Sequence, residues 1–148
     1  MTGEPQSEPG RVLAVDPGDK RIGLALSDPT RTLARPAGAI PNEGYEATVR
    51  RVQALAAEQG VTLVLVGLPV HLDGGESEGS KKARRLARKL ADALKLPVEL
   101  VDEGLTSVEA DDVLAEVRPT SRRKPAAGGE RDAVAAAVIL RGWLERGR

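Results

Sequence analysis

The sequence contains no cysteine, no phenylalanine, a single histidine, and only one tyrosine and one tryptophan, Tyr45 and Trp143. The absence of cysteine excludes disulfide frameworks, thiolate nucleophiles and cysteine-based zinc sites. Because aromatic residues are so few, the core must consist of Val, Leu, Ile and Ala. The same scarcity argues against a single-strand binding protein, which would stack bases on several aromatic rings.

Long apolar runs are also missing. The longest, around 61–66 and 133–140, are far shorter than a membrane span. The first ten residues, MTGEPQSEPG, are polar and lack the basic and apolar regions of a secretory signal. We therefore expect residues 1–10 to be a disordered tail and residues 11–148 to form a single domain. The expected location is the cytoplasm, without membrane contact.

The chain has no net charge, because its 22 Lys and Arg residues balance its 22 Asp and Glu residues. The basic residues nevertheless cluster in a predicted helix and in a loop near residue 120, and such clusters can bind phosphates. A charged run is more often simply a solvated face. The candidates for nucleic-acid binding are Lys20, Arg21, Lys81, Lys82, Arg85, Arg122, Arg123 and Lys124.

Hydrophobic periodicity predicts an α/β domain with a mixed sheet covered by helices. Two strands joined by a turn begin it, and a third, interrupted at Pro36, should lie at an edge. Gly60 is placed to end the first helix. The predicted strands are 11–16, 21–27, 32–40, 61–66 and 97–102, and the predicted helices are 44–59, 80–95, 106–117 and one from about 131 to 147.

Acidic residues stand at the ends of these elements. Asp16 follows the first strand, Asp102 and Glu103 follow the last strand, and Asp132 opens the final helix. If the strands are neighbours, the carboxylates form an oxygen-rich site that suits Mg²⁺ or Mn²⁺ better than zinc. Taken singly, Asp16 could be an ordinary turn residue and Asp132 a helix-opening acid favoured by the helix dipole.

Four segments in this order, VDPGDKRIGLALSD, VGLPVHLDG, VELVDEGLTSVEA and DAVAAAVIL, resemble the YqgF/RuvX family of ribonuclease H-like nucleases. The resemblance runs from about Arg11 to Leu144, almost the whole chain. It implies a ribonuclease H-like fold with a five-stranded mixed sheet flanked by helices. It also implies a phosphodiester-cutting endonuclease with Asp16, Glu103 and Asp132 as catalytic residues and as ligands of two Mg²⁺ or Mn²⁺ ions.

The resemblance does not fix the roles of three positions in or next to these motifs. The family usually carries Arg after the acidic pair, where this chain has Gly104, and Lys20, Arg21 or the 122–124 loop could take over the missing charge. Asp102 should point to the opposite face from Glu103 and support the site rather than bind metal. His71, the only histidine, is more simply a solvated loop residue than a ligand.

The resemblance implies nucleic acid as the partner, either a four-way DNA junction or a ribosomal RNA precursor. A junction resolvase would favour a two-fold homodimer, whereas a ribosomal RNA nuclease could be a monomer. The sequence also fits two alternative functions. Asp16, Gly18 and Gly23 also fit the phosphate loop of an actin or sugar-kinase lobe. A non-catalytic nucleic-acid-binding module is the third reading, with Gly104 as its first sign.

Overall fold

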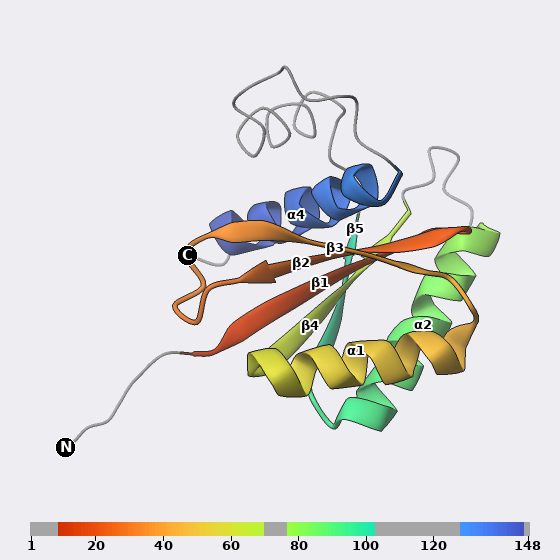
Figure 1. Cartoon of the computed structure of the whole chain (residues 1–148), viewed down its shortest axis with the longest axis horizontal. Coiled ribbons are helices and arrows are strands. Elements are labelled where there is room, and N and C mark those ends of the chain that lie inside the picture. The colour runs from red at the N-terminus through yellow and green to blue at the C-terminus, as the bar shows by residue number, and fades with distance from the viewer. Residues whose placement is uncertain (1–8, 70–76, 103–127, 147–148) are drawn as a thin grey trace.

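The computed structural model describes residues 9–69, 77–102 and 128–146 (Figure 1). These residues form five strands and three helices, most of them close to the predicted ranges. The elements are β1 (Arg11–Pro17), β2 (Arg21–Ser27), β3 (Ala34–Pro41), α1 (Tyr45–Gln59), β4 (Val61–Leu68), α2 (Glu78–Leu94), β5 (Val98–Asp102) and α4 (Gly128–Arg146).

The strands form one mixed sheet in the order β3-β2-β1-β4-β5. β1, β2 and β3 are antiparallel neighbours, whereas β4 runs parallel to both β1 and β5. β3 lies at the edge, as the proline within it predicts. Because β1, β4 and β5 are parallel, their carboxyl ends meet at one edge of the sheet. Ligand sites in α/β sheets lie at such edges.

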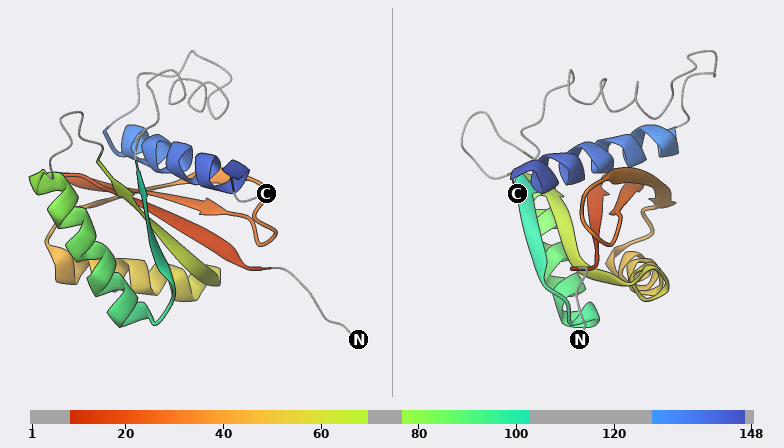
Figure 2. Two further views of the ribbon diagram at one scale, coloured as in Figure 1. Left: turned by 180° about the vertical axis from the view of Figure 1, so that it is seen from behind. Right: turned by 90° about the vertical axis from the view of Figure 1, so that its left-hand side faces the viewer.

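Of the three helices described, α4 lies on one face of the sheet, and α1 and α2 lie together on the other (Figure 2). Alternate residues of β1 pack into the two cores, with Val12 and Ala14 toward α4 and Leu13 and Val15 toward α1 and α2. All four side chains have no exposed surface. β1 and most of β4 are therefore buried on both faces, as continuous apolar runs predict.

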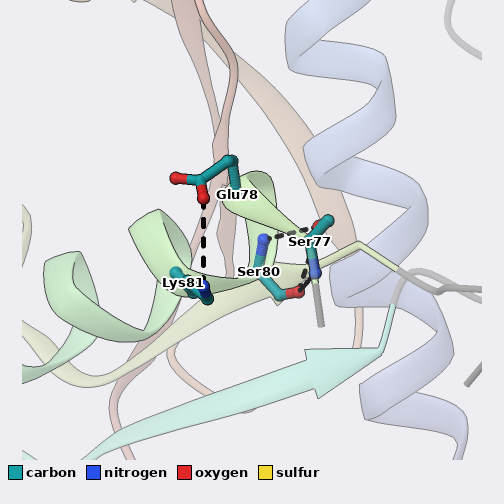
Figure 3. A network of polar contacts seen from close by, with 4 residues as sticks. All are labelled: Ser77, Glu78, Ser80 and Lys81. Carbon is teal, nitrogen blue, oxygen red and sulfur yellow. Dashed lines mark hydrogen bonds and ion pairs between the residues drawn. The ribbon is translucent and has the colours of Figure 1, made fainter. Parts of the chain in front are cut away.

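The N-terminus of α2 lies two residues earlier than the predicted start. Ser77 accepts a hydrogen bond from the Ser80 amide at 3.0 Å, and its own amide donates to the Ser80 hydroxyl at 3.1 Å (Figure 3). This reciprocal pair is a capping box with Ser in place of the usual Glu or Gln. Glu78 in the same turn lies 3.8 Å from the Lys81 ammonium. At the other end of the preceding helix, Gly60 adopts φ 67° and ends α1 as predicted.

β3 begins two residues later than predicted because Asp28 takes up the amides that a longer strand would use. Its Oδ1 accepts hydrogen bonds from the amides of Thr32 and Leu33, each at 2.7 Å, and its Oδ2 accepts one from the Thr30 hydroxyl. Burial alone would raise the pKa of Asp28. The three hydrogen bonds lower it more, so the pKa lies well below the usual range of a carboxyl group.

We expect Asp28→Asn to remove an acid-sensitive part of the stability. Because the pKa of Asp28 is lower in the folded chain than its value of about 3.9 in the unfolded chain, ionised Asp28 stabilises the fold fully above that pH. The stabilisation is lost as the pH falls below about 4, through the folded pKa. Urea unfolding should show the variant about 1–2 kcal/mol less stable at pH 7. The two curves should converge toward pH 2; a constant gap would contradict this account.

The loop between β2 and β3 is tied to the start of the chain by Arg31. The guanidinium donates to the Gly10 carbonyl at 3.0 Å and to the Thr62 hydroxyl at 3.1 Å, and it lies 5.9 Å from the ring centre of Trp143. The Gly10 amide in turn donates to the Pro29 carbonyl at 3.0 Å. Pro9 and Gly10, assigned to the tail by the sequence, are therefore held against the sheet.

The predicted tail over residues 1–8 and the predicted helix over 106–117 lie outside the described residues. The final helix, by contrast, is described and begins three residues before its predicted start. None of the helices in the described ranges is both long enough and apolar enough to cross a membrane.

Candidate active site

Asp16 is the sixth residue of β1 and lies half-buried at the carboxyl edge of the sheet. Since side chains alternate along a strand, Asp16 shares the α4 face with Val12 and Ala14. Pro17 and the turn after it end the strand, which leaves the carboxylate at the rim. β1 therefore presents this acid toward the helix that carries Asp132.

Gly23 brings α4 to the same place. It lies directly across from Asp16 in the β1–β2 pair. A Cβ atom at Gly23 would lie only 2.0 Å from the Asp132 carbonyl oxygen and 2.4 Å from its carbonyl carbon. The backbone of α4 thus rests on β2 at a contact that only glycine permits. Asp16 and Asp132 occupy neighbouring positions on one face as a result.

Asp132 lies in the second turn of α4, as the fifth residue of the helix, and does not open it as predicted. Its carboxylate accepts a hydrogen bond from Arg21 Nε at 2.9 Å, in an ion pair whose side chains are 34% and 44% exposed, respectively. A pair this exposed contributes at most about 1 kcal/mol to stability. Its main effect is to orient the Asp132 carboxylate at the rim.

The donor set at this rim fits a hard divalent cation. Asp16 and Asp132 supply only carboxylate oxygens, and oxygen ligands suit Mg²⁺ and Mn²⁺. Within the described ranges, no three His, Asp or Glu side chains gather into a metal site. The third predicted ligand, Glu103, lies outside those ranges, together with Gly104, His71 and the cluster Arg122, Arg123 and Lys124.

Asp102 is described and is the last residue of β5. The preceding residue, Val101, packs into the core beneath α4, so Asp102 points to the opposite face of the sheet. Asp102 therefore lies on the face opposite to Asp16 and Asp132, and its predicted supporting role stays a prediction.

The predicted basic residues separate into two groups. Arg21 contacts Asp132, and Lys20 is exposed in the β1–β2 turn beside it. Lys81, Lys82 and Arg85 lie on α2, against the opposite face of the sheet (Figure 2). Lys81 pairs with Glu78, and the Arg85 guanidinium lies 5.9 Å from the ring centre of Tyr45. The structure therefore does not bring the α2 residues to the face that carries Asp16 and Asp132.

The sequence placed Gly23 only in a possible phosphate loop, and its close contact with α4 was not predicted. The signal was present, because a glycine inside the alternating strand RIGLALS marks a close backbone approach. Thr48 was missed as well: the helical spacing in α1 drew attention to its apolar residues, yet this threonine is 1% exposed and belongs to the buried stripe.

Comparisons with known proteins agree with this architecture. A family model described as "RuvX: Holliday junction resolvase" matches residues 10–146. A protein of Anaeromyxobacter sp. (strain Fw109-5), named "Putative pre-16S rRNA nuclease", is 42% identical over 135 residues, which cover 91% of this chain and 96% of that protein. A protein of Clavibacter michiganensis with the same name is 43% identical over 141 residues, covering 94% and 85%.

Solved structures of junction resolvases share the fold. RuvC of T. thermophilus, in complex with a Holliday junction substrate, has a TM-score of 0.59 at 15% identity and covers 93% of this chain and 96% of its own. The fowlpox virus resolvase in complex with junction DNA has a TM-score of 0.60 at 12% identity, with coverage of 92% and 97%. These similarities confirm the ribonuclease H-like fold. The sequence matches go further, and the chain belongs to the RuvX family.

Proposed function

We propose that the chain is a divalent-metal-dependent endonuclease that hydrolyses phosphodiester bonds in structured nucleic acid. One observation carries the proposal: Asp16 and Asp132 share one face at the carboxyl edge of the sheet, where α4 rests on Gly23. Two carboxylates at a sheet rim, in a nuclease family, are groups that can hold the metal ions used in phosphodiester hydrolysis. Glu103 completes the proposed set of ligands.

In this proposal the chain supplies binding, orientation and charge. Asp16 and Asp132 are the groups that hold Mg²⁺ or Mn²⁺, with Glu103 as the third. When bound, such ions stabilise the negative charge that develops on the phosphodiester oxygens. Arg21 fixes the direction of the Asp132 carboxylate through the bond from its Nε. Its remaining guanidinium N–H groups, which have no partner among the described residues, are the proposed donors to a phosphate oxygen.

Arg21 is also relevant to Gly104, which stands where the family usually has an arginine. Members of the family usually have an arginine beside the acidic pair, and here the Arg21 guanidinium reaches Asp132 from β2. We propose that Arg21 supplies the positive charge that Gly104 cannot. The non-catalytic reading would then lose its main support, because the missing charge has a replacement.

Ribosomal RNA precursor is the substrate that we favour, because relatives about 40% identical over most of the chain bear that name. A four-way DNA junction is the second candidate, on the description of the family model. Resolution of a junction requires two symmetric cuts and therefore a two-fold dimer. The two substrates thus predict different oligomeric states as well as different products.

The test is cleavage of a labelled ribosomal RNA precursor and a labelled four-way junction, side by side, with Mg²⁺ or Mn²⁺. Asp16→Asn keeps the size of the side chain but removes the charge that would hold the cation. We expect the wild-type protein to cut the RNA near its 5′ end and the variant to cut at least about 10³-fold more slowly, equivalent to ~4 kcal/mol of barrier.

Each outcome has a distinct meaning. Paired nicks in the junction, lost in Asp16→Asn, would replace the RNA assignment with a resolvase. If both substrates bind without being cut, the protein is a non-catalytic module and the nuclease proposal fails. Saturable binding of a nucleoside triphosphate with neither substrate bound would instead favour the kinase-like reading.

A further inference from the structure

A cavity of about 230 Å³ opens on the other side of the β1–β2 turn from the candidate active site. Pro17 and Gly18, directly after Asp16, form one wall, and Ile22 places it on the α1 and α2 face of the sheet. Most of the remaining lining comes from the N-terminal halves of α1 and α2. The full lining is Pro17, Gly18, Asp19, Ile22, Asn42, Gly44, Tyr45, Thr48, Gly79, Lys82 and Leu86.

The two helix N-termini at this cavity differ in how their amides are satisfied. Ser77 and Ser80 cap α2 reciprocally (Figure 3). The N-cap of α1 is Gly44, which has φ 102° and provides no capping side chain. The first amides of a helix have no acceptor within the helix, so those of α1 are left to water or to a ligand. The positive end of the α1 dipole therefore favours an anion here.

Thr48 gives an independent reason to expect a ligand. It lines the cavity, yet it is only 1% exposed. Its amide donates to the Gly44 carbonyl at 3.1 Å, but its hydroxyl makes no hydrogen bond with any residue in the described ranges. A buried hydroxyl without a partner is costly and uncommon in folded proteins. A bound acceptor oxygen would satisfy it.

The charges around the cavity fit an anion with one exception. Lys82 lines it and forms no ion pair within the described part of the chain. Arg85 and Lys89 lie nearby over the ring of Tyr45, at 5.9 and 5.6 Å from its centre, and add to the positive potential. Asp19 opposes them, but it is exposed in the β1–β2 turn, where its side chain can turn toward solvent.

We infer that this cavity is a phosphate subsite, which takes a backbone phosphate of the nucleic acid near the bond cut at Asp16 and Asp132. The identification of the ligand as a nucleic-acid phosphate rests on the proposed function. The α1 amides, the Thr48 hydroxyl and the Lys82 ammonium are its donors. The β1–β2 turn then lies between the two phosphates, with the reacting one on the α4 face and the anchored one on the α1 and α2 face.

Nucleic-acid binding by the full chain carrying Asp16→Asn tests the inference without cleavage. Binding is measured by fluorescence anisotropy of labelled RNA precursor and junction DNA. When Thr48→Val is combined with Asp16→Asn, binding should weaken about tenfold, because one hydrogen bond to a charged group is lost. Lys82→Gln should weaken binding and lower the salt slope by about one. Asp19→Asn should have the opposite sign and tighten binding about twofold.

Two controls separate binding from folding. Lys95→Gln removes the same charge from the opposite end of α2, at its C-cap, and should change neither affinity nor salt slope. Thr48→Val should leave the urea midpoint unchanged or raised, because the hydroxyl it removes has no hydrogen-bond partner among the residues that the structure describes. A lowered midpoint would show instead that the hydroxyl has a structural role.

A second experiment titrates the protein with inorganic phosphate alone and monitors the chemical shifts of the backbone amides by NMR. Saturable shifts at Tyr45, Thr48 and Lys82, abolished by Thr48→Val, are expected whether or not the chain is a nuclease. If they occur but the variants bind nucleic acid like the parent, the subsite takes a free phosphate and the backbone assignment is wrong. If neither arm responds to Thr48→Val or Lys82→Gln, the inference is overturned. If the parent binds no nucleic acid at all, the proposed function fails and the phosphate arm alone decides the subsite.

Discussion

Replacement of Asp132 by Asn should slow cleavage by about 10³-fold or more, the largest effect on activity that we expect in the described part of the chain. The carboxylate lies on the face of Asp16, and an amide would bind a divalent cation far more weakly. Stability should change by less than about 1 kcal/mol, because the ion pair with Arg21 is exposed on both sides. Single-turnover cleavage and urea unfolding of the same preparation measure the two quantities.

Arg21→Gln is the matched control, because it breaks the same ion pair and keeps the carboxylate. We expect it to slow cleavage by about 10–100-fold, the usual range for a group that orients a metal ligand. Higher Mg²⁺ should restore part of its rate but none of the rate of Asp132→Asn. Equal losses in the two variants would mean that Asp132 acts only through Arg21, and the metal assignment would be wrong.

Gly23→Ala should damage both stability and activity. The new methyl group would lie 2.0 Å from the Asp132 carbonyl oxygen, so the backbone of α4 must move away from β2. Overpacking of cores costs about 1–3 kcal/mol, and a clash with backbone, which cannot change rotamer, should reach the upper end or exceed it. The shift also displaces Asp132, and a misplacement of about 1 Å costs about 10²-fold in rate. Urea unfolding, and cleavage at a temperature where the variant stays folded, give both values.

Gly79→Ala provides the comparison for this substitution. A Cβ there meets only ordinary contacts, at 3.4 Å from Pro69 Cγ and 3.6 Å from Ser77 Oγ. Since Gly79 lies in the first turn of α2, alanine should stabilise the helix by up to about 1 kcal/mol. A Gly23→Ala variant as stable and as active as wild type would show that α4 is not fixed at this contact.

Local patterns in the sequence predicted most of the fold because most elements carry a strong period or a clear stop signal. β2 and the end of α1 agree to the residue, and β1 and β4 extend slightly beyond their predicted ends. The starts of β3 and α2 were misplaced where side chains bind the backbone. Asp28 takes the amides of Thr32 and Leu33, and Ser77 pairs with another serine where a Glu or Gln is expected.

The site was less predictable, because its parts meet through the tertiary fold. Asp16 and Asp132 were identified from the resemblance, and their shared face agrees with it. The ion pair between Arg21 and Asp132 joins residues 111 positions apart, and no local pattern encodes it. Nothing in the local sequence distinguishes Thr48 from other helical residues, and only the tertiary fold buries its side chain.

The position of α4 has a consequence for synthesis of the protein on the ribosome. One core is closed only when residues 133–144 pack over apolar side chains from β1, β2, β4 and β5. Until α4 emerges, these apolar side chains lack the helix that covers them in the folded chain and can be recognised by chaperones. Asp132 arrives with the same helix. In the proposed nuclease, a nascent chain that has not yet packed α4 against the sheet lacks one of its two described site carboxylates, and we expect it not to cut nucleic acid.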